Sequence, residues 1–233
     1  MLLYSKLALS YGASIQTGVQ VTGWKRAGPG FEVHTSAGNY TGNKLVFAAG
    51  PWTSRLIPAL SSSLSVTSQS LAWVTPHNPA AFELGRLPCW VIAEEDQPGI
   101  FYGFPCLPAG RFDGPPGLKL GHHFHGPATD PDNPDRKPPI GEEAKLIQVL
   151  NKYFPGSYQG THTLKTCLYT NTPDEHFIID FLPGYGRDVA VAAGFSGHGF
   201  KFVSVVGEII SDLITREHTE LPVEFLIAAR FLK

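Results

Sequence analysis

The feature that most constrains the fold is a glycine-rich turn between an apolar strand and an amphipathic helix near the C-terminus. Residues Val189–Ala193 are uniformly apolar, which predicts a buried strand. Apolar residues recur at helical spacing over 202–215, which predicts the helix. The three glycines at 194–199 let the backbone approach a ligand closely, and the helix N-terminus favours an anion. The alternative is tight packing of the turn alone.

Lys201 lies in the first turn of the predicted helix. A cation is unfavourable there because of the helix dipole. Its placement therefore suggests that it holds an anion, and the alternative is an ordinary exposed lysine.

Charge and cysteine content exclude several classes of protein. The chain has 18 Lys and Arg against 20 Asp and Glu, so no basic excess exists to neutralise nucleic-acid phosphates. Its three cysteines are odd in number and form no CxxC motif, which favours a reducing compartment. No signal peptide, no apolar run long enough to span a membrane and no C-terminal Ser-Lys-Leu are found, so we expect a cytoplasmic protein.

The remaining sequence predicts mixed α and β structure. Two helices are expected at 2–11 and 141–153. Short strands between Gly and Pro turns are expected in the following ranges: 19–24, 31–34, 44–50, 71–75, 89–93, 100–104, 118–124 and 177–179. The Pro- and Asp-rich stretch 126–139 is expected to be a solvated loop.

Two long motifs carry a family resemblance: CLYTNTPDEHFIID at 167–180 and AGFSGHGFK at 193–201. Through these motifs the chain resembles the monomeric sarcosine oxidase family. That family's relatives include N-methyltryptophan oxidase, peroxisomal sarcosine/pipecolate oxidases and fructosyl-amine oxidases. These are FAD-dependent amine oxidases of the D-amino-acid-oxidase-like superfamily. The resemblance implies a monomeric enzyme whose partners are O₂ and a small amine or amino acid.

The resemblance also implies which residues hold FAD. Cys167 matches the cysteine that carries the flavin through a thioether to its 8α-methyl group. Taken alone, Cys167 would be a buried free thiol. Gly50 matches a glycine that approaches the dinucleotide. The cofactor-binding turn comprises Gly197, His198, Gly199, Phe200 and Lys201, and Lys201 also matches the lysine that binds the substrate carboxylate.

The implied catalytic residues lie on two predicted strands. Lys119 matches a lysine that activates oxygen through its fixed positive charge. Strand alternation puts Lys119, Gly121, His123 and His125 on one face and His122 on the other, which disfavours a metal site in the histidine cluster. His123 matches an active-site histidine. Tyr102 and Tyr169 match substrate-pocket tyrosines; alone they would be half-buried strand aromatics.

The largest departure from the family is that no GxGxxG motif occurs. We therefore expect a partial FAD-binding Rossmann-like domain (1–68 and 173–216) that lacks its N-terminal βαβ unit. It would be interleaved with an antiparallel-sheet substrate domain (69–172 and 217–233). We interpret the chain as a truncated gene or a gene fragment rather than half of a split protein. We expect it, expressed as written, to be insoluble or to bind FAD poorly.

The function predicted first is oxidation of the C–N bond of a secondary or N-methyl amino acid, with O₂ reduced to hydrogen peroxide. A second hypothesis is a dehydrogenase of the same fold that uses another electron acceptor, against which Lys119 argues. A third is a catalytically inert fragment that acts only in protein interaction. The substrate itself is not predicted.

Overall fold

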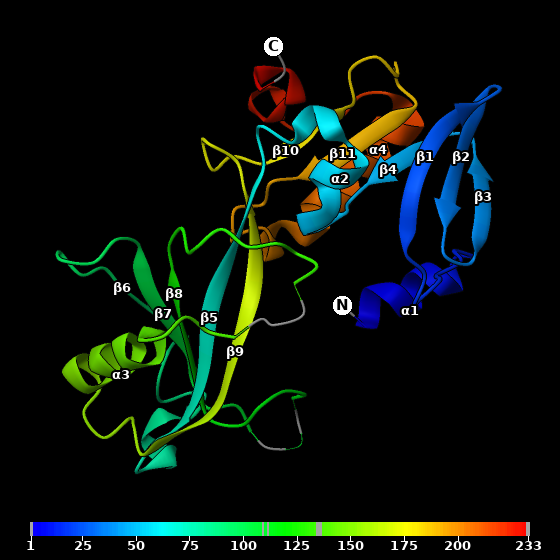
Figure 1. Cartoon of the computed structure of the whole chain (residues 1–233). Coiled ribbons are helices and arrows are strands. Elements are labelled where there is room, and N and C mark those ends of the chain that lie inside the picture. Colours follow the sequence, from blue (N-terminus) through cyan, green and yellow to red (C-terminus); the bar gives the residue numbers. More distant parts are fainter. Residues whose placement is uncertain (1, 109, 111, 134–136, 232–233) are drawn as a thin grey trace.

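A computed structural model describes residues 2–108, 110, 112–133 and 137–231 (Figure 1). Its strands form three sheets. The first is an antiparallel sheet with the order β1-β2-β3, built from β1 (Val21–Ala27), β2 (Gly30–Thr35) and β3 (Gly38–Gly42). Helix α1 (Leu2–Ser10) precedes it in the chain. The two ends of the predicted domain ranges, residues 1 and 232–233, lie outside the described residues.

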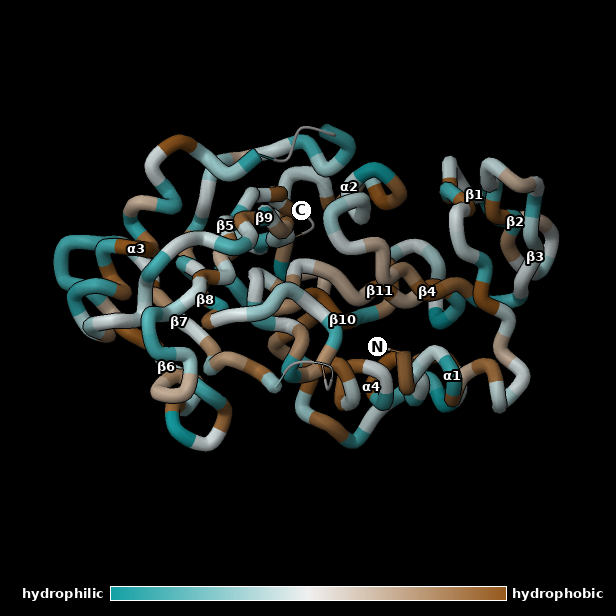
Figure 2. Tube along the Cα trace, turned by 90° about the horizontal axis from the view of Figure 1, so that it is seen from below, coloured by the Kyte–Doolittle hydropathy of each residue, from teal (hydrophilic) through white to brown (hydrophobic). Residues whose placement is uncertain are grey.

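The second sheet has the order β10-β11-β4 and comprises β10 (Ile178–Phe181), β11 (Val189–Ala193) and β4 (Leu45–Phe47). Strand β11 runs antiparallel to β10 and parallel to β4. Helices α2 (Thr53–Leu56) and α4 (Val203–Arg216) lie on opposite sides of this sheet (Figure 2). Alternate side chains of the strands therefore enter two separate apolar cores.

The third sheet is antiparallel with the order β6-β7-β8-β5-β9. Its strands are β5 (Ser65–Thr75), β6 (Trp90–Ile92), β7 (Ile100–Phe104), β8 (Leu118–His123) and β9 (Gly160–Asn171). Helix α3 (Glu142–Tyr153) covers one face, and its Leu146, Val149 and Leu150 share a core with Val74 and Leu120. The opposite face is free to carry polar groups.

Short 3-10 turns connect these elements. They are η1 (Gly50–Trp52), η2 (Pro58–Leu60), η3 (Pro79–Phe82), η4 (Phe200–Phe202), η5 (Glu224–Leu226) and η6 (Ala228–Arg230). The long strands β5 and β9 extend from the five-stranded sheet to the unit built around β11 (Figure 1).

The predicted mixed α/β fold with antiparallel sheets is confirmed. The helix predicted at 2–11 is present as α1, yet none of its residues is buried. Strand β9 was not among the predicted strands, because Thr, His and Lys in its first half obscure the alternation. The domain boundaries remain a prediction; in the described residues, η5 and η6 pack against β10 and α4.

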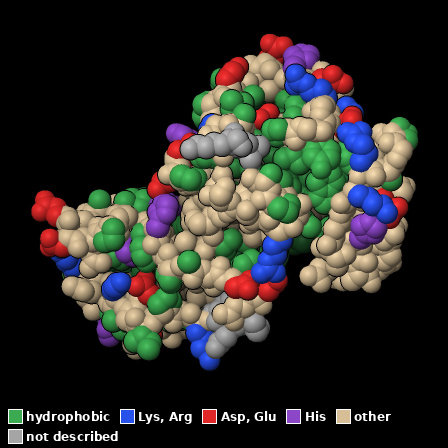
Figure 3. All heavy atoms as spheres, turned by 45° about the horizontal axis from the view of Figure 1, so that its top comes forward, with side chains coloured by type: hydrophobic (Ala, Val, Ile, Leu, Met, Phe, Trp, Pro, Cys, Tyr) green, Lys and Arg blue, Asp and Glu red, His purple; other side chains and the backbone are tan. Residues whose placement is uncertain are grey.

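Hydrophobic side chains gather between the β11 unit and the β1–β3 sheet on the face shown in Figure 3. Exposed apolar residues also include Leu3 of α1, at 75% exposure, and Val46 of β4, at 45%. Among the described strands, β4 pairs with β11 alone. Within the same residues, no helix has both the length and the apolar character needed to cross a bilayer.

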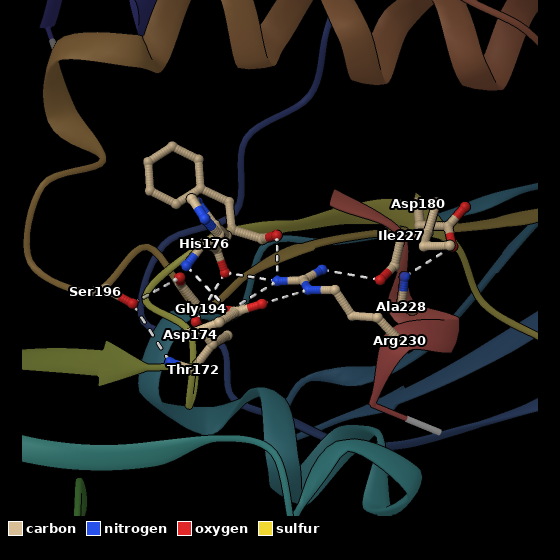
Figure 4. A network of polar contacts seen from close by, with 10 residues as sticks. Thr172, Asp174, His176, Asp180, Gly194, Ser196, Ile227, Ala228 and Arg230 are labelled. Carbon is tan, nitrogen blue, oxygen red and sulfur yellow. Dashed lines mark hydrogen bonds and ion pairs between the residues drawn. The ribbon is translucent and has the colours of Figure 1, made fainter. Parts of the chain in front are cut away.

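Arg230 and Ala228 hold the C-terminal segment against β10 and the residues just before it (Figure 4). Its guanidinium Nε lies 2.9 Å from Asp174 Oδ2, and Nη2 donates to the carbonyl oxygens of His176 and Phe177 at 2.8 and 2.9 Å. Ala228 N donates to Asp180 Oδ2 at 2.9 Å. The hydrogen bond from Arg230 holds the pKa of Asp174 below its ordinary value. These acidic motif residues therefore stabilise the scaffold.

Candidate active site

The sheet face opposite α3 carries the predicted catalytic side chains. In the ladder between β7 and β8, Tyr102 pairs with Gly121 and Phe104 pairs with Lys119. Directly paired residues share a face, as do alternate residues of one strand, so Tyr102, Lys119 and His123 lie together. The predicted alternation is thereby confirmed for Lys119, Gly121 and His123.

The adjoining strands place further predicted residues on this face. Strand β5 pairs with both β8 and β9, with Leu71 opposite Gly121 on one side and Lys165 on the other. Cys167 and Tyr169 follow Lys165 in steps of two, so they also face the site.

Predicted residues from β7, β8, β9 and the glycine-rich turn meet at one cavity of about 550 Å³. Its lining includes the following predicted residues: Tyr102, Lys119, His123, Tyr169, Gly197, His198, Phe200 and Lys201. Gly199 precedes η4 beside this lining. Cys167 and Gly50 do not line the cavity itself.

A hydrogen bond of 3.1 Å joins His123 Nδ1 to the Tyr169 hydroxyl oxygen. Burial raises the pKa of Tyr169 and of Tyr102. Burial also lowers the pKa of His123, and the neighbouring His198 and Lys201 act in the same direction. At neutral pH these side chains therefore form an uncharged, hydrogen-bonded wall. With Nδ1 turned to Tyr169, Nε2 of His123 is the atom left for a ligand.

The glycine-rich turn packs directly on β9. Ser196 has a φ of +46°, and its backbone N–H donates to Thr170 O at 2.9 Å. Thr172 N donates to Ser196 Oγ at 3.3 Å. A Cβ atom on Gly197 would lie 2.2 Å from Cε2 of Tyr169, so only glycine fits there. The turn thus brings the start of η4 and α4 against Tyr169, with the free N–H groups of the helix start at the cavity.

Cys167 is a half-buried free thiol. Burial raises its pKa, and the charge of Lys119 acts in the opposite direction, so the two side chains are close. Gln69 lies opposite Cys167 in the ladder and is 1% exposed. Its Oε1 has no hydrogen-bond partner within the described residues. A thiol beside an unpaired buried acceptor fits a polar planar ligand such as a flavin.

Gly50 lies at the start of η1, separated from the end of β4 by two residues, with a φ of +51°. Apart from its two chain neighbours, no described residue has a heavy atom within 4 Å of the position where a Cβ would stand. This backbone is therefore open to the close approach expected of a cofactor.

Two predictions about histidines have different outcomes. His122 lies on the opposite face as predicted, stacked on Phe101 at 4.1 Å, with Nε2 2.7 Å from Pro98 O. His125 lies beyond the end of β8, so the strand alternation does not place it. It bonds Glu175 Oε1 at 2.7 Å.

Sequence reasoning missed several residues of this face. Trp73 of β5 and Phe104 of β7 both stand opposite Lys119, and Cys89 lines the cavity. The only signal was their alternation with neighbouring strand residues, which does not show which strands become neighbours.

Comparison with known proteins identifies relatives of this arrangement. The profile of the family described as FAD dependent oxidoreductases matches residues 1–213. Monomeric sarcosine oxidase of Bacillus sp. (strain NS-129) is 37% identical over 223 residues, which are 93% of this chain and 55% of that protein. N-methyl-L-tryptophan oxidase of Salmonella dublin is 33% identical over 186 residues, 78% of this chain and 46% of that protein.

A solved structure of NikD, an unusual amino acid oxidase essential for nikkomycin biosynthesis, superposes with a TM-score of 0.79 at 25% identity. The match covers 95% of this chain and 57% of NikD. The chain thus spans about half the length of the curated relatives it matches.

Proposed function

The chain belongs to the family of FAD-dependent oxidoreductases, and we propose from this that it carries much of the active site of an amine oxidase. Its substrate would be a secondary or N-methyl amino acid, as the names of its relatives suggest. The observation that supports the proposal most is that eight predicted residues line one cavity.

FAD, when bound, would accept a hydride from the carbon attached to the substrate nitrogen and pass two electrons to O₂, which gives hydrogen peroxide. The imine product would hydrolyse to an amine and an aldehyde or keto acid. Cys167 would hold FAD through a thioether, and Gly50 would contact its dinucleotide part. The turn from Gly197 through His198, Gly199 and Phe200 to Lys201 would face the flavin ring with the helix N-terminus.

The cavity residues would bind and orient the substrate. Lys201, a point charge at the rim of the cavity, would pair with the substrate carboxylate. The hydroxyl groups of Tyr102 and Tyr169 would contact the substrate. His123, which burial keeps neutral, would accept a proton or a hydrogen bond from the substrate nitrogen at Nε2.

Lys119 would act on oxygen rather than on the amine. A fixed ammonium on a half-buried sheet face stabilises the negative charge that oxygen gains on reduction. Its role separates the oxidase from a dehydrogenase of the same fold, which would not need that charge.

The test is Lys119→Met in the flavin-containing protein, with Lys165→Met on the same sheet face as the matched control. Stopped-flow absorbance near 450 nm should show a much slower reoxidation by O₂ in Lys119→Met, with anaerobic reduction by the amine unchanged. Equal slowing of both half-reactions would contradict the role of Lys119. Rapid turnover with a dye but no oxygen consumption would favour the dehydrogenase.

An absence of flavin absorbance in the purified chain would favour the inert fragment. A monomeric state and a cytoplasmic location are part of the same proposal. Sedimentation velocity tests the first, and cell fractionation tests the second.

A further inference from the structure

Lys119 lies between two aromatic rings. Its Nζ is 5.3 Å from the ring centroid of Trp73 and 5.3 Å from that of Phe104. Both distances are within the range over which a ring face attracts a cation. The ladders explain the arrangement, because Trp73 and Phe104 are the two residues directly opposite Lys119 on the neighbouring strands β5 and β7.

Among the described residues, the Lys119 ammonium has no ion-pair partner. A carboxylate would neutralise the charge, whereas two ring faces orient it and leave it intact. The side chain is half-buried, so the rings also replace part of the water that would otherwise surround the ammonium.

The orientation of the Lys119 side chain decides which of two cavities its charge faces. Lys119 and Phe104 line the 550 Å³ cavity and also a second cavity of about 460 Å³, and Trp73 lines only the second. A swing of the long lysine side chain would therefore move its charge from one cavity to the other. Phe104 is fixed in turn by an edge contact with Tyr102, with ring centroids 6.0 Å apart.

We propose that Trp73 and Phe104 are positioning residues that clamp Lys119 between their ring faces and keep its charge unpaired at the wall of the active-site cavity. The consequence for oxygen rests on the function proposed above. The clamp itself depends only on the geometry of β5, β7 and β8.

The direct test measures the reactivity of Lys119 without any flavin. Trp73→Leu and Phe104→Leu remove a ring, whereas Trp73→Phe and Phe104→Tyr retain one. Acetylation of each lysine by a limiting amine-specific reagent is followed by peptide mass spectrometry. Lys119 should react about two- to twentyfold faster in the leucine variants and near the wild-type rate in the ring-retaining variants. Lys165 on β9 is the internal reference and should keep its rate.

The second arm uses the flavin-containing protein. Reoxidation by O₂ should slow about two- to twentyfold in Trp73→Leu, be restored in Trp73→Phe, and leave anaerobic reduction within about twofold. Equal acetylation of Lys119 in leucine and ring-retaining variants would overturn the clamp. Should Trp73→Leu not fold, Phe104→Leu decides, because Phe104 is 38% exposed at the end of its strand.

The two arms separate this inference from the proposed function. Faster acetylation in the leucine variants, combined with normal oxygen reactivity of Lys119→Met, would support the clamp and contradict the role of Lys119 in oxygen reduction. Slow reoxidation in Lys119→Met with unchanged acetylation in every ring variant would do the reverse.

Discussion

Replacing Gly197 with alanine should damage the protein through one identifiable contact. The added Cβ would lie 2.2 Å from Cε2 and 2.5 Å from Cδ2 of Tyr169, at a residue whose φ is +77°. A left-handed conformation costs an alanine about 1 kcal/mol. Displacing Tyr169 adds about 2 kcal/mol for overpacking and for the loss of its hydrogen bond to His123. We expect Gly197→Ala to lower the free energy of unfolding by about 3 kcal/mol.

Two other glycines provide matched controls. Gly184 has a φ of +89° but no atom within 4 Å of its Cβ position, so Gly184→Ala carries only the conformational cost of about 1 kcal/mol. Gly207, inside α4, also has open space, and Gly207→Ala should stabilise by about 0.5–1 kcal/mol.

Urea unfolding followed by tryptophan fluorescence gives the three free energies. The difference in free energy of unfolding between Gly197→Ala and Gly184→Ala measures the cost of the contact with Tyr169. If the two lose the same stability, Tyr169 moves aside freely, and the view that the turn and β9 form one rigid wall of the cavity is wrong.

Three further outcomes are expected. Burial lowers the pKa of His122 and of His123, so below pH about 6.5 the unfolded chain binds protons that the folded chain does not. The folded state should therefore lose stability, and the urea midpoint should fall, as the pH is lowered from 7 to 5. The midpoint should fall less in His122→Phe, which lacks one of the two histidines. Arg230→Met removes the hydrogen bonds to Asp174 and to three backbone carbonyls and should lower the free energy of unfolding by about 2–4 kcal/mol. Arg216→Met is the control: among the described residues, the exposed Arg216 side chain forms a single ion pair, with Asp212, and its loss should change the unfolding midpoint little. Cys167→Ser should let acid precipitation release all bound flavin, which the unmodified protein should retain; retention by the serine variant would exclude the thioether.

The candidate catalytic face could be predicted only to the extent that alternation within a single strand determines it. The two-residue period of a strand puts Lys119 and His123 on one face of β8 and His122 on the other. This prediction needs only the backbone geometry of that one strand. The order of the strands is not contained in that period. Trp73 is separated from Lys119 by more than forty residues of sequence, so nothing local indicated that they pair.

Helix α1 shows that a correctly predicted element need not be buried. Its spacing of Leu3, Leu7 and Tyr11 predicts an apolar stripe, and the helix forms, yet the stripe is exposed. Periodicity predicts which side of a helix would be buried, but burial also needs a neighbouring element to cover that side.

The long motif at 167–180 divides its residues between chemistry and support. Cys167 and Tyr169 face the cavity side, while Asp174 and Asp180 bind Arg230 and Ala228 of the C-terminal segment. Thr172 links the two parts, since its N–H donates to Ser196 Oγ in the glycine-rich turn and its Oγ1 donates to His176 O. Asp174 and Asp180 thus have structural partners, and the specificity of a motif does not by itself make its acidic residues catalytic.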